Sequence, residues 1–95
     1  MGLNVVIGDC VFILSGCTFN HDNVLEDNIV VASKVTLAGF VHVESGVYLG
    51  QSCSVREFLR IGRRATIGMG AVVVKNVEPN SVMVGNPARL LRMKD

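Results

Sequence analysis

One spacing constrains this chain more than any other property of its sequence: an apolar residue returns at every sixth position. The segment 61–74, IGRRATIGMGAVVV, sets the register with Ile61-Gly62 and Ile67-Gly68. Extended through the chain, the register meets an apolar residue at all 13 of its positions, although the chain is only 49% hydrophobic. A period of six residues is typical of parallel β-helices. The positions are Met1, Ile7, Ile13, Phe19, Leu25, Val31, Leu37, Val43, Leu49, Val55, Ile61, Ile67 and Val73.

A second set of apolar positions lies four residues after the first, and Asn23 is its only polar member. The two residues between the sets are mostly turn formers, such as Asp9-Cys10 and Ser15-Gly16. Each group of six therefore predicts a short strand with two inward side chains, followed by a two-residue corner. If three such sides close one coil, the coil repeats every 18 residues. We expect an all-β, single-stranded parallel β-helix of hexapeptide repeats with about four coils.

The repeat divides the chain into two parts. Coils are expected over residues 1–77, and a terminal strand and tail over residues 78–95, within one domain of residues 1–95. The tail is expected to cap the open end of the helix or to cover a neighbouring chain. The first coil starts in register with no cap before it, so we expect a lost N-terminal domain or a partner to cover it.

Charge and cysteine content narrow the class of partner. The formal net charge of +1 argues against nucleic acid or a membrane surface as the main partner, and no stretch resembles a signal peptide or a transmembrane span. The three cysteines lack metal-binding spacing, which favours reduced thiols in a bacterial-type cytoplasm. Two histidines cannot supply the three ligands of a zinc site of the carbonic anhydrase kind, so no metal is expected.

One of the three corners differs from the others. Residues 18 apart place His21-Asp22, Gly39-Phe40, Glu57-Phe58 and Lys75-Asn76 in one row. Phe40 and Phe58 occupy turn positions that should face solvent, so they predict an exposed apolar ladder. Such a ladder indicates a subunit contact or a ligand groove, and we predict a homotrimer. His42, on a strand face, is interpreted as an ordinary surface or interface histidine.

The chain resembles the C-terminal β-helix domain of the sialic acid and amino-sugar acetyltransferases (NeuD-like). The resemblance is carried by residues 20–23 (NHDN), 37–39 (LAG) and 85–89 (GNPAR), and it covers roughly residues 16–91. It implies a left-handed helix with three sides in each coil, a homotrimer, and acetyl-CoA in the groove between neighbouring subunits. It also implies a small acceptor, a sugar or amino sugar, bound beside the thioester.

The resemblance also implies roles for individual residues. His21 would be the general base on the acceptor amine or hydroxyl, because an imidazole titrates near neutral pH, and Asp22 would hold its tautomer. The Gly39 N–H would bind the thioester carbonyl. The remaining cofactor-binding residues would be Glu57 and Lys75 along the pantetheine arm, Lys75 and Arg89 at the phosphates, and Pro87 against the adenine.

Two functions follow. The first is an acetyl-CoA-dependent O- or N-acetyltransferase acting on a sugar or amino-sugar acceptor. The alternative is a non-catalytic trimeric scaffold, or the remnant of a longer two-domain enzyme. The missing N-terminal cap and acceptor-binding domain support the alternative, although a separate protein could supply that domain. Two further departures from the family are Asn23, at an inward position where relatives usually place Cys or another small apolar residue, and Val30, where many relatives carry a second histidine. The change at Val30 weakens the acetyl-CoA site. A single row of Thr18, Thr36 and Ser54 is too narrow for ice binding.

Overall fold

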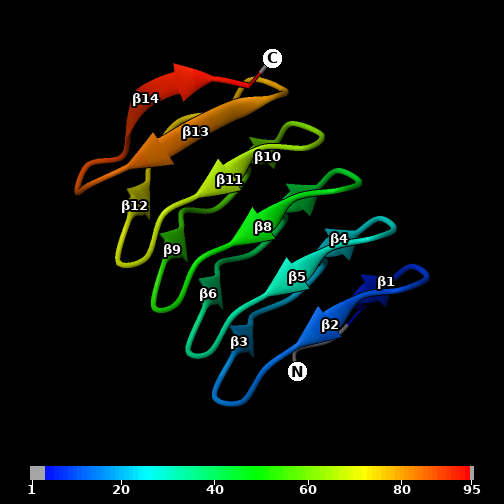
Figure 1. The fold of residues 1–95 in the computed structure, drawn as a ribbon. Coiled ribbons are helices and arrows are strands. Elements are labelled where there is room, and N and C mark those ends of the chain that lie inside the picture. The colour runs from blue at the N-terminus through cyan, green and yellow to red at the C-terminus, as the bar shows by residue number, and fades with distance from the viewer. Residues whose placement is uncertain (1–3, 95) are drawn as a thin grey trace.

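The computed structural model describes residues 4–94, which form a parallel β-solenoid of about four turns (Figure 1). Every regular element within this range is a strand, so the predicted all-β class is confirmed. The repeat position at Met1 lies outside the described residues. The strands are β1 (Val6–Ile7), β2 (Phe12–Ile13), β3 (Thr18–Phe19), β4 (Val24–Leu25), β5 (Val30–Val31), β6 (Thr36–Leu37), β7 (His42–Val43), β8 (Tyr48–Leu49), β9 (Ser54–Val55), β10 (Arg60–Ile61), β11 (Thr66–Ile67), β12 (Val72–Val73), β13 (Ser81–Val84) and β14 (Arg89–Met93).

Three sheets form the three sides of the solenoid. Their strand orders are β1-β4-β7-β10, β14-β13-β11-β8-β5-β2 and β12-β9-β6-β3. Successive coils pair in parallel at the predicted offset, so that Val6 faces Val24 and Val24 faces His42. Figure 1 shows the coils stacked from the blue N-terminal end to the red C-terminal end.

The core is a column of apolar side chains inside the solenoid. From Phe19 to Val77 both predicted sets of inward residues are buried. The prediction that Ile7 is fully inward is wrong: it packs against the core but remains partly exposed, and Ile13 is 36% exposed. Both belong to the first coil, which has a neighbouring coil on one side only in the described chain.

Each two-residue corner from Asp9-Cys10 to Met69-Gly70 places its second residue in the left-handed region of backbone space. The φ angle is 53° at Asp22, 59° at Phe40 and 62° at Phe58, although none of these is glycine. Such a conformation costs on the order of 1 kcal/mol per residue. Hydrogen bonds between coils stabilise it, for example Phe40 N to His21 O at 3.0 Å and Phe58 N to Gly39 O at 3.0 Å.

The last coil is shorter than the others. Val77 pairs with Ile61, rather than with Leu59 as a constant repeat would require. Asn76 Oδ1 accepts a hydrogen bond of 2.8 Å from Arg60 N, so a side chain occupies the place of a corner peptide. The predicted Lys75-Asn76 corner is therefore a bend, and Lys75 does not continue the corner row as a two-residue turn.

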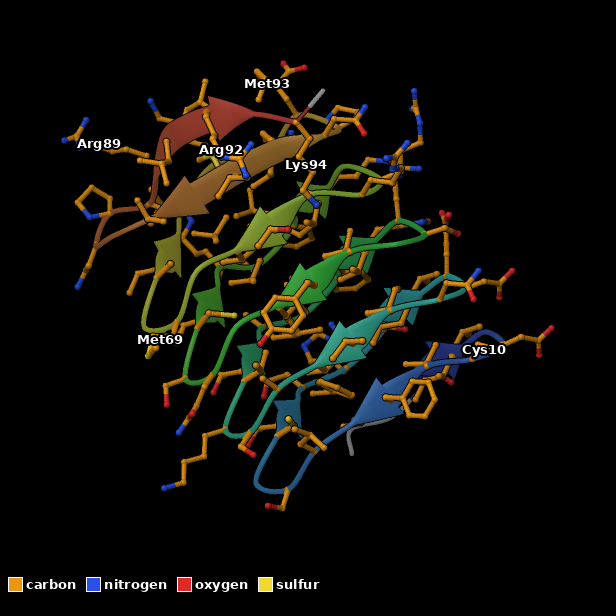
Figure 2. The ribbon with its side chains drawn as sticks, viewed as in Figure 1. Cys10, Met69, Arg89, Arg92, Met93 and Lys94 are labelled. Carbon is orange, nitrogen blue, oxygen red and sulfur yellow. The ribbon has the colours of Figure 1, made fainter. Side chains whose placement is uncertain are left out.

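The terminal residues form a β-hairpin. β13 pairs in parallel with β11, and β14 pairs antiparallel with β13. All five residues of β14 are exposed, so β14 extends one side of the solenoid. The expectation that the tail caps the open end of the helix is therefore wrong for β14. Figure 2 shows Arg89, Arg92, Met93 and Lys94 on this hairpin. Residues 4–94 contain no helix that is long and apolar enough to span a membrane.

Candidate functional site

The corner that follows β3, β6 and β9 carries the candidate site. It presents His21-Asp22, Gly39-Phe40 and Glu57-Phe58 one above another in successive coils, as the sequence predicts. Backbone hydrogen bonds join each corner to the next, which fixes the row at the spacing between coils. The corner is an open surface, since residues 4–94 of a single chain enclose no pocket.

His21 and Asp22 form a hydrogen-bonded pair although they are adjacent in sequence. His21 Nδ1 lies 3.0 Å from Asp22 Oδ2, and the two side chains are 51% and 35% exposed. The backbone at Asp22 is left-handed, with a φ angle of 53°. With the proton on Nδ1, the lone pair of Nε2 is free to accept a proton from another molecule.

Gly39 lies directly beneath the His21 imidazole. A Cβ atom at Gly39 would stand 2.6 Å from both Cε1 and Nε2 of His21, closer than non-bonded carbon atoms approach. The absence of a side chain at Gly39 therefore makes room for the histidine ring. The Gly39 N–H donates no hydrogen bond within the described residues. The free nitrogen of His21 and a free backbone donor thus lie on the same small patch of surface.

The predicted apolar ladder forms the wall of this patch. The Phe40 and Phe58 rings stack with their centroids 5.0 Å apart and 5° between their planes. The His21 and Phe40 rings make a T-shaped contact with their centroids 5.2 Å apart. Phe58 is 71% exposed. The ladder therefore holds the histidine ring on one side and leaves an apolar surface uncovered on the other.

Beneath the corner, Asn23 is a fully buried polar residue among apolar neighbours. Its Nδ2 donates to the Ala38 carbonyl at 2.7 Å, while its Oδ1 has no partner within residues 4–94. The sequence marks Asn23 as the exception in its column but does not reveal this bond, which joins residues 15 apart.

The other predicted cofactor-binding residues lie apart from His21. Glu57 is in the corner row and pairs with Arg56 at 3.6 Å. Lys75 follows β12, and Pro87 lies in the turn between β13 and β14, with Arg89 at the start of β14. β12 and β3 are the opposite edges of one sheet. The full width of that sheet therefore separates Lys75, Pro87 and Arg89 from His21.

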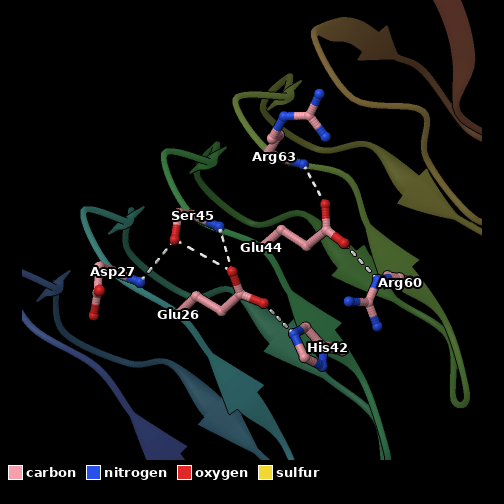
Figure 3. Close-up of polar contacts among 7 residues, drawn as sticks. All are labelled: Glu26, Asp27, His42, Glu44, Ser45, Arg60 and Arg63. Carbon is pink, nitrogen blue, oxygen red and sulfur yellow. Dashed lines mark hydrogen bonds and ion pairs between the residues drawn. The ribbon is translucent and has the colours of Figure 1, made fainter.

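A second polar cluster, absent from the sequence-based predictions, covers the side formed by β4, β7 and β10 (Figure 3). Glu26 accepts hydrogen bonds from His42 Nε2 at 2.5 Å and from Ser45 N and Oγ at 3.2 Å each. One coil later Glu44 accepts from Arg60 Nε at 2.5 Å and from Arg63 N at 2.8 Å. The signal that could have found the cluster is a glutamate followed 16 residues later by a histidine or an arginine.

This cluster is electrostatically complementary. The hydrogen bond from His42 lowers the pKa of Glu26 below its ordinary value, and the hydrogen bond from Arg60 does the same for Glu44. Each hydrogen bond favours the ionised carboxylate and so lowers the pKa. The interpretation of His42 as a surface histidine agrees with its place on the outer face of β7.

The three cysteines are free thiols. Burial raises the pKa of Cys53 to about 12, so this thiol stays protonated at neutral pH. The Cys17 thiol donates to the Ala32 carbonyl at 3.0 Å. No group of three or more His, Cys, Asp or Glu side chains in residues 4–94 is arranged to hold a metal ion.

No protein-family model matches the chain. Among curated proteins it is similar to an acyl-(acyl-carrier-protein)–UDP-N-acetylglucosamine O-acyltransferase from Herminiimonas arsenicoxydans. The two are 39% identical over 82 residues, which cover 86% of this chain and 31% of the relative. The chain therefore spans about a third of the length of the curated relatives it matches.

Two solved structures superpose closely. A serine acetyltransferase from Neisseria gonorrhoeae is 30% identical with a TM-score of 0.91, over 96% of this chain and 39% of that protein. An acetyltransferase of Vibrio cholerae complexed with acetyl coenzyme A is 20% identical with a TM-score of 0.92, over 97% of this chain and 61% of that one. The second likeness concerns the fold alone.

Proposed function

This chain carries a hexapeptide-repeat domain of the acyltransferase family, and on that premise we propose that it is an acetyl-CoA-dependent acetyltransferase. The acceptor is the hydroxyl or amino group of a sugar or amino sugar. The observation that supports this best is the His21–Asp22 pair, whose free Nε2 lies over Gly39.

The proposed mechanism begins with the acceptor group beside His21. Nε2 takes the proton as the acceptor oxygen or nitrogen bonds to the thioester carbonyl carbon. The Gly39 N–H donates to the negative oxygen of the tetrahedral intermediate. The C–S bond then breaks, and the leaving thiolate of CoA takes the proton from the His21 imidazolium. Asp22 stabilises the imidazolium between these two transfers.

The corner row supports a donor that lies along the solenoid axis. The N–H groups of Gly39 and Glu57 donate to nothing within the described residues and stand one coil apart, about 4.8 Å. A pantetheine arm with its thioester at Gly39 therefore points toward the last coil. At that end Lys75 and Arg89 would meet the phosphates and Pro87 the adenine. Acetyl-CoA is the ligand of the Vibrio cholerae protein with this fold.

A second donor is favoured by one observation. The curated relative takes its acyl group from an acyl carrier protein, according to its name. Both donors offer a thioester on a pantetheine arm, so the same corner row suits either. The exposed cations Arg89 and Arg92 would then meet the carrier protein instead of the CoA phosphates.

The site is proposed to work in a cytoplasmic homotrimer. The exposed ladder of Phe40 and Phe58 would face a neighbouring copy, which closes the groove over the donor. A separate protein or a further domain would bind part of the acceptor.

Thermal shift and thiol release test the proposal together. Acetyl-CoA is expected to raise the melting temperature, because a ligand that binds only the folded state stabilises it. Thiol release is then measured with a panel of amino sugars, with acetyl-CoA and acyl carrier protein as donors in separate arms. If the protein neither binds acetyl-CoA nor releases thiol from either donor, the proposed enzyme function is contradicted and the scaffold is favoured.

A further inference from the structure

We propose that Asn23 is a positioning residue that aims and polarises the Gly39 N–H toward the thioester carbonyl. The inference rests on the proposed acyl transfer, because it concerns how the same site is built. It assigns a role to a residue that does not touch either substrate and lies wholly inside the solenoid.

The geometry of one peptide unit carries the argument. The carbonyl of Ala38 and the N–H of Gly39 belong to the same peptide, which is trans. In a trans peptide these two groups point in opposite directions. Asn23 holds the Ala38 oxygen in the core at 2.7 Å, so the Gly39 N–H points out of the core at the corner. It emerges beside the His21 ring, which covers the α-carbon of Gly39.

The same hydrogen bond changes the strength of the donor. A carbonyl that accepts a hydrogen bond withdraws electron density from its amide nitrogen, and linked hydrogen bonds polarise one another. The Gly39 N–H becomes a better donor to the negative oxygen that develops during transfer. A fixed donor aimed at developing charge is the arrangement that accelerates such reactions.

Three other corners close without a buried amide. In each of them the carbonyl before the turn accepts from the N–H three residues later: Cys53 N to Gly50 O, Ala65 N to Gly62 O and Ala71 N to Gly68 O, all at 3.2 Å. Before Ser33-Lys34 the Cys17 thiol makes an equivalent bond to Ala32 at 3.0 Å. A small thiol can therefore satisfy such a carbonyl, and an asparagine is not needed for that purpose alone.

Asn23 also carries a penalty that the thiol avoids. Its Oδ1 is buried with no partner in the described chain, and an unpaired buried acceptor destabilises the folded state. A locally unfavourable group that persists in a packed core points to a role other than stability. The placement of Asn23 next to the peptide that carries Gly39 identifies that role.

The test compares Asn23→Val, Asn23→Cys and Cys17→Val with the wild type. Asn23→Val exchanges one unpaired acceptor, Asn23 Oδ1, for another, the Ala38 oxygen, so its melting temperature should stay close to that of the wild type. Its kcat is expected to fall about 10-fold to 100-fold, since losing one such donor outright costs 10² to 10³. The KM for acetyl-CoA and the pH profile should stay unchanged, because the His21–Asp22 contact is intact. Asn23→Cys should recover part of kcat, and Cys17→Val should leave kcat unchanged.

A readout independent of activity is the amide nitrogen resonance of Gly39 in NMR spectra. It should move upfield in Asn23→Val and partly return in Asn23→Cys, even if the wild type transfers no acyl group. An inert wild type with this shift contradicts the proposed function but not the geometry. Unchanged kcat or an unmoved resonance in Asn23→Val would overturn the role of Asn23, as would equal losses of kcat in Asn23→Val and Cys17→Val. If Asn23→Val does not fold, Asn23→Ala, which also lacks a donor, decides: wild-type kcat and resonance in that variant would refute the role.

Discussion

The imidazole of His21 fills the space that a side chain at Gly39 would occupy, with Cε1 and Nε2 both 2.6 Å from the position of a Cβ atom. This contact alters what a substitution at Gly39 should do. On the sequence alone, a larger residue is expected to block the thioester. In the structure it first displaces the catalytic candidate itself.

Gly39→Ala is therefore predicted to lower transfer at least 100-fold while the solenoid still folds, because the added methyl group pushes an exposed ring and no core residue. Thiol release and the melting temperature measure the two effects. Gly68→Ala is the matched control, since its nearest neighbour would be a side-chain methyl of Val84 at 3.0 Å. Equal losses of transfer in both variants would contradict the special role of Gly39.

His21→Ala is predicted to slow transfer by about 10² to 10⁴-fold, the usual contribution of a general base. Binding of acetyl-CoA, measured by calorimetry, should be nearly unchanged because Gly39 and the corner row remain. Stability should change by about 0.5 kcal/mol or less, since the side chain is 51% exposed. His42→Ala, at the only other histidine, should retain transfer.

Phe58→Asp is predicted to weaken assembly of the trimer, because it places a carboxylate in an apolar contact and removes the stack on Phe40. Sedimentation should show a larger monomer fraction at micromolar protein. Met69→Asp is the control, since Met69 is 79% exposed at a different corner. A wild type that sediments as a monomer would itself refute the trimer.

Glu44→Gln is predicted to make the free energy of unfolding less dependent on pH under acidic conditions. The pKa of Glu44 is lowered from 4.5 in the folded state, chiefly by the hydrogen bond from Arg60. Its stabilisation is therefore complete above pH 4.5 and is lost as the pH falls through the folded pKa. The difference at neutral pH should be about 1 kcal/mol or less, as for other surface pairs.

Urea unfolding between pH 3 and pH 7 measures this effect. Glu78→Gln serves as its control, because the Glu78 side chain is exposed and makes no hydrogen bond within residues 4–94. If both variants lose stability with acid as the wild type does, the pair of Glu44 and Arg60 has no part in the acid limb.

The sequence predicts the solenoid well because one periodicity determines strand, corner and core together. Val31, Leu37 and Val43 are buried where the register puts them. The sequence does not predict the short last coil. Val77 lies four residues after Val73 and is apolar, so it fits the second inward set whether or not the corner before it is shortened. In the structure, the pairing of Val77 with Ile61 and the hydrogen bond from Arg60 N to the Asn76 side chain reveal the contraction.

The candidate site is predictable in its row but not in its contacts. The spacing of 18 aligns His21 with Gly39, and Phe40 with Phe58. That the ring lies over Gly39 depends on the side-chain torsions of His21, which no spacing determines. The bond from Asn23 to Ala38 joins neighbouring coils diagonally through the core, and a pattern of polar and apolar residues carries no such information.

The antiparallel direction of β14 also limits how copies of this protein can associate. A solenoid whose layers all run parallel offers at its ends a template for the next layer, and repeated addition would produce a fibre. On the side that ends in β14, an incoming parallel coil would meet a strand that runs the opposite way. The reversal of one strand in the terminal hairpin thus opposes fibre growth at that end of the sheet.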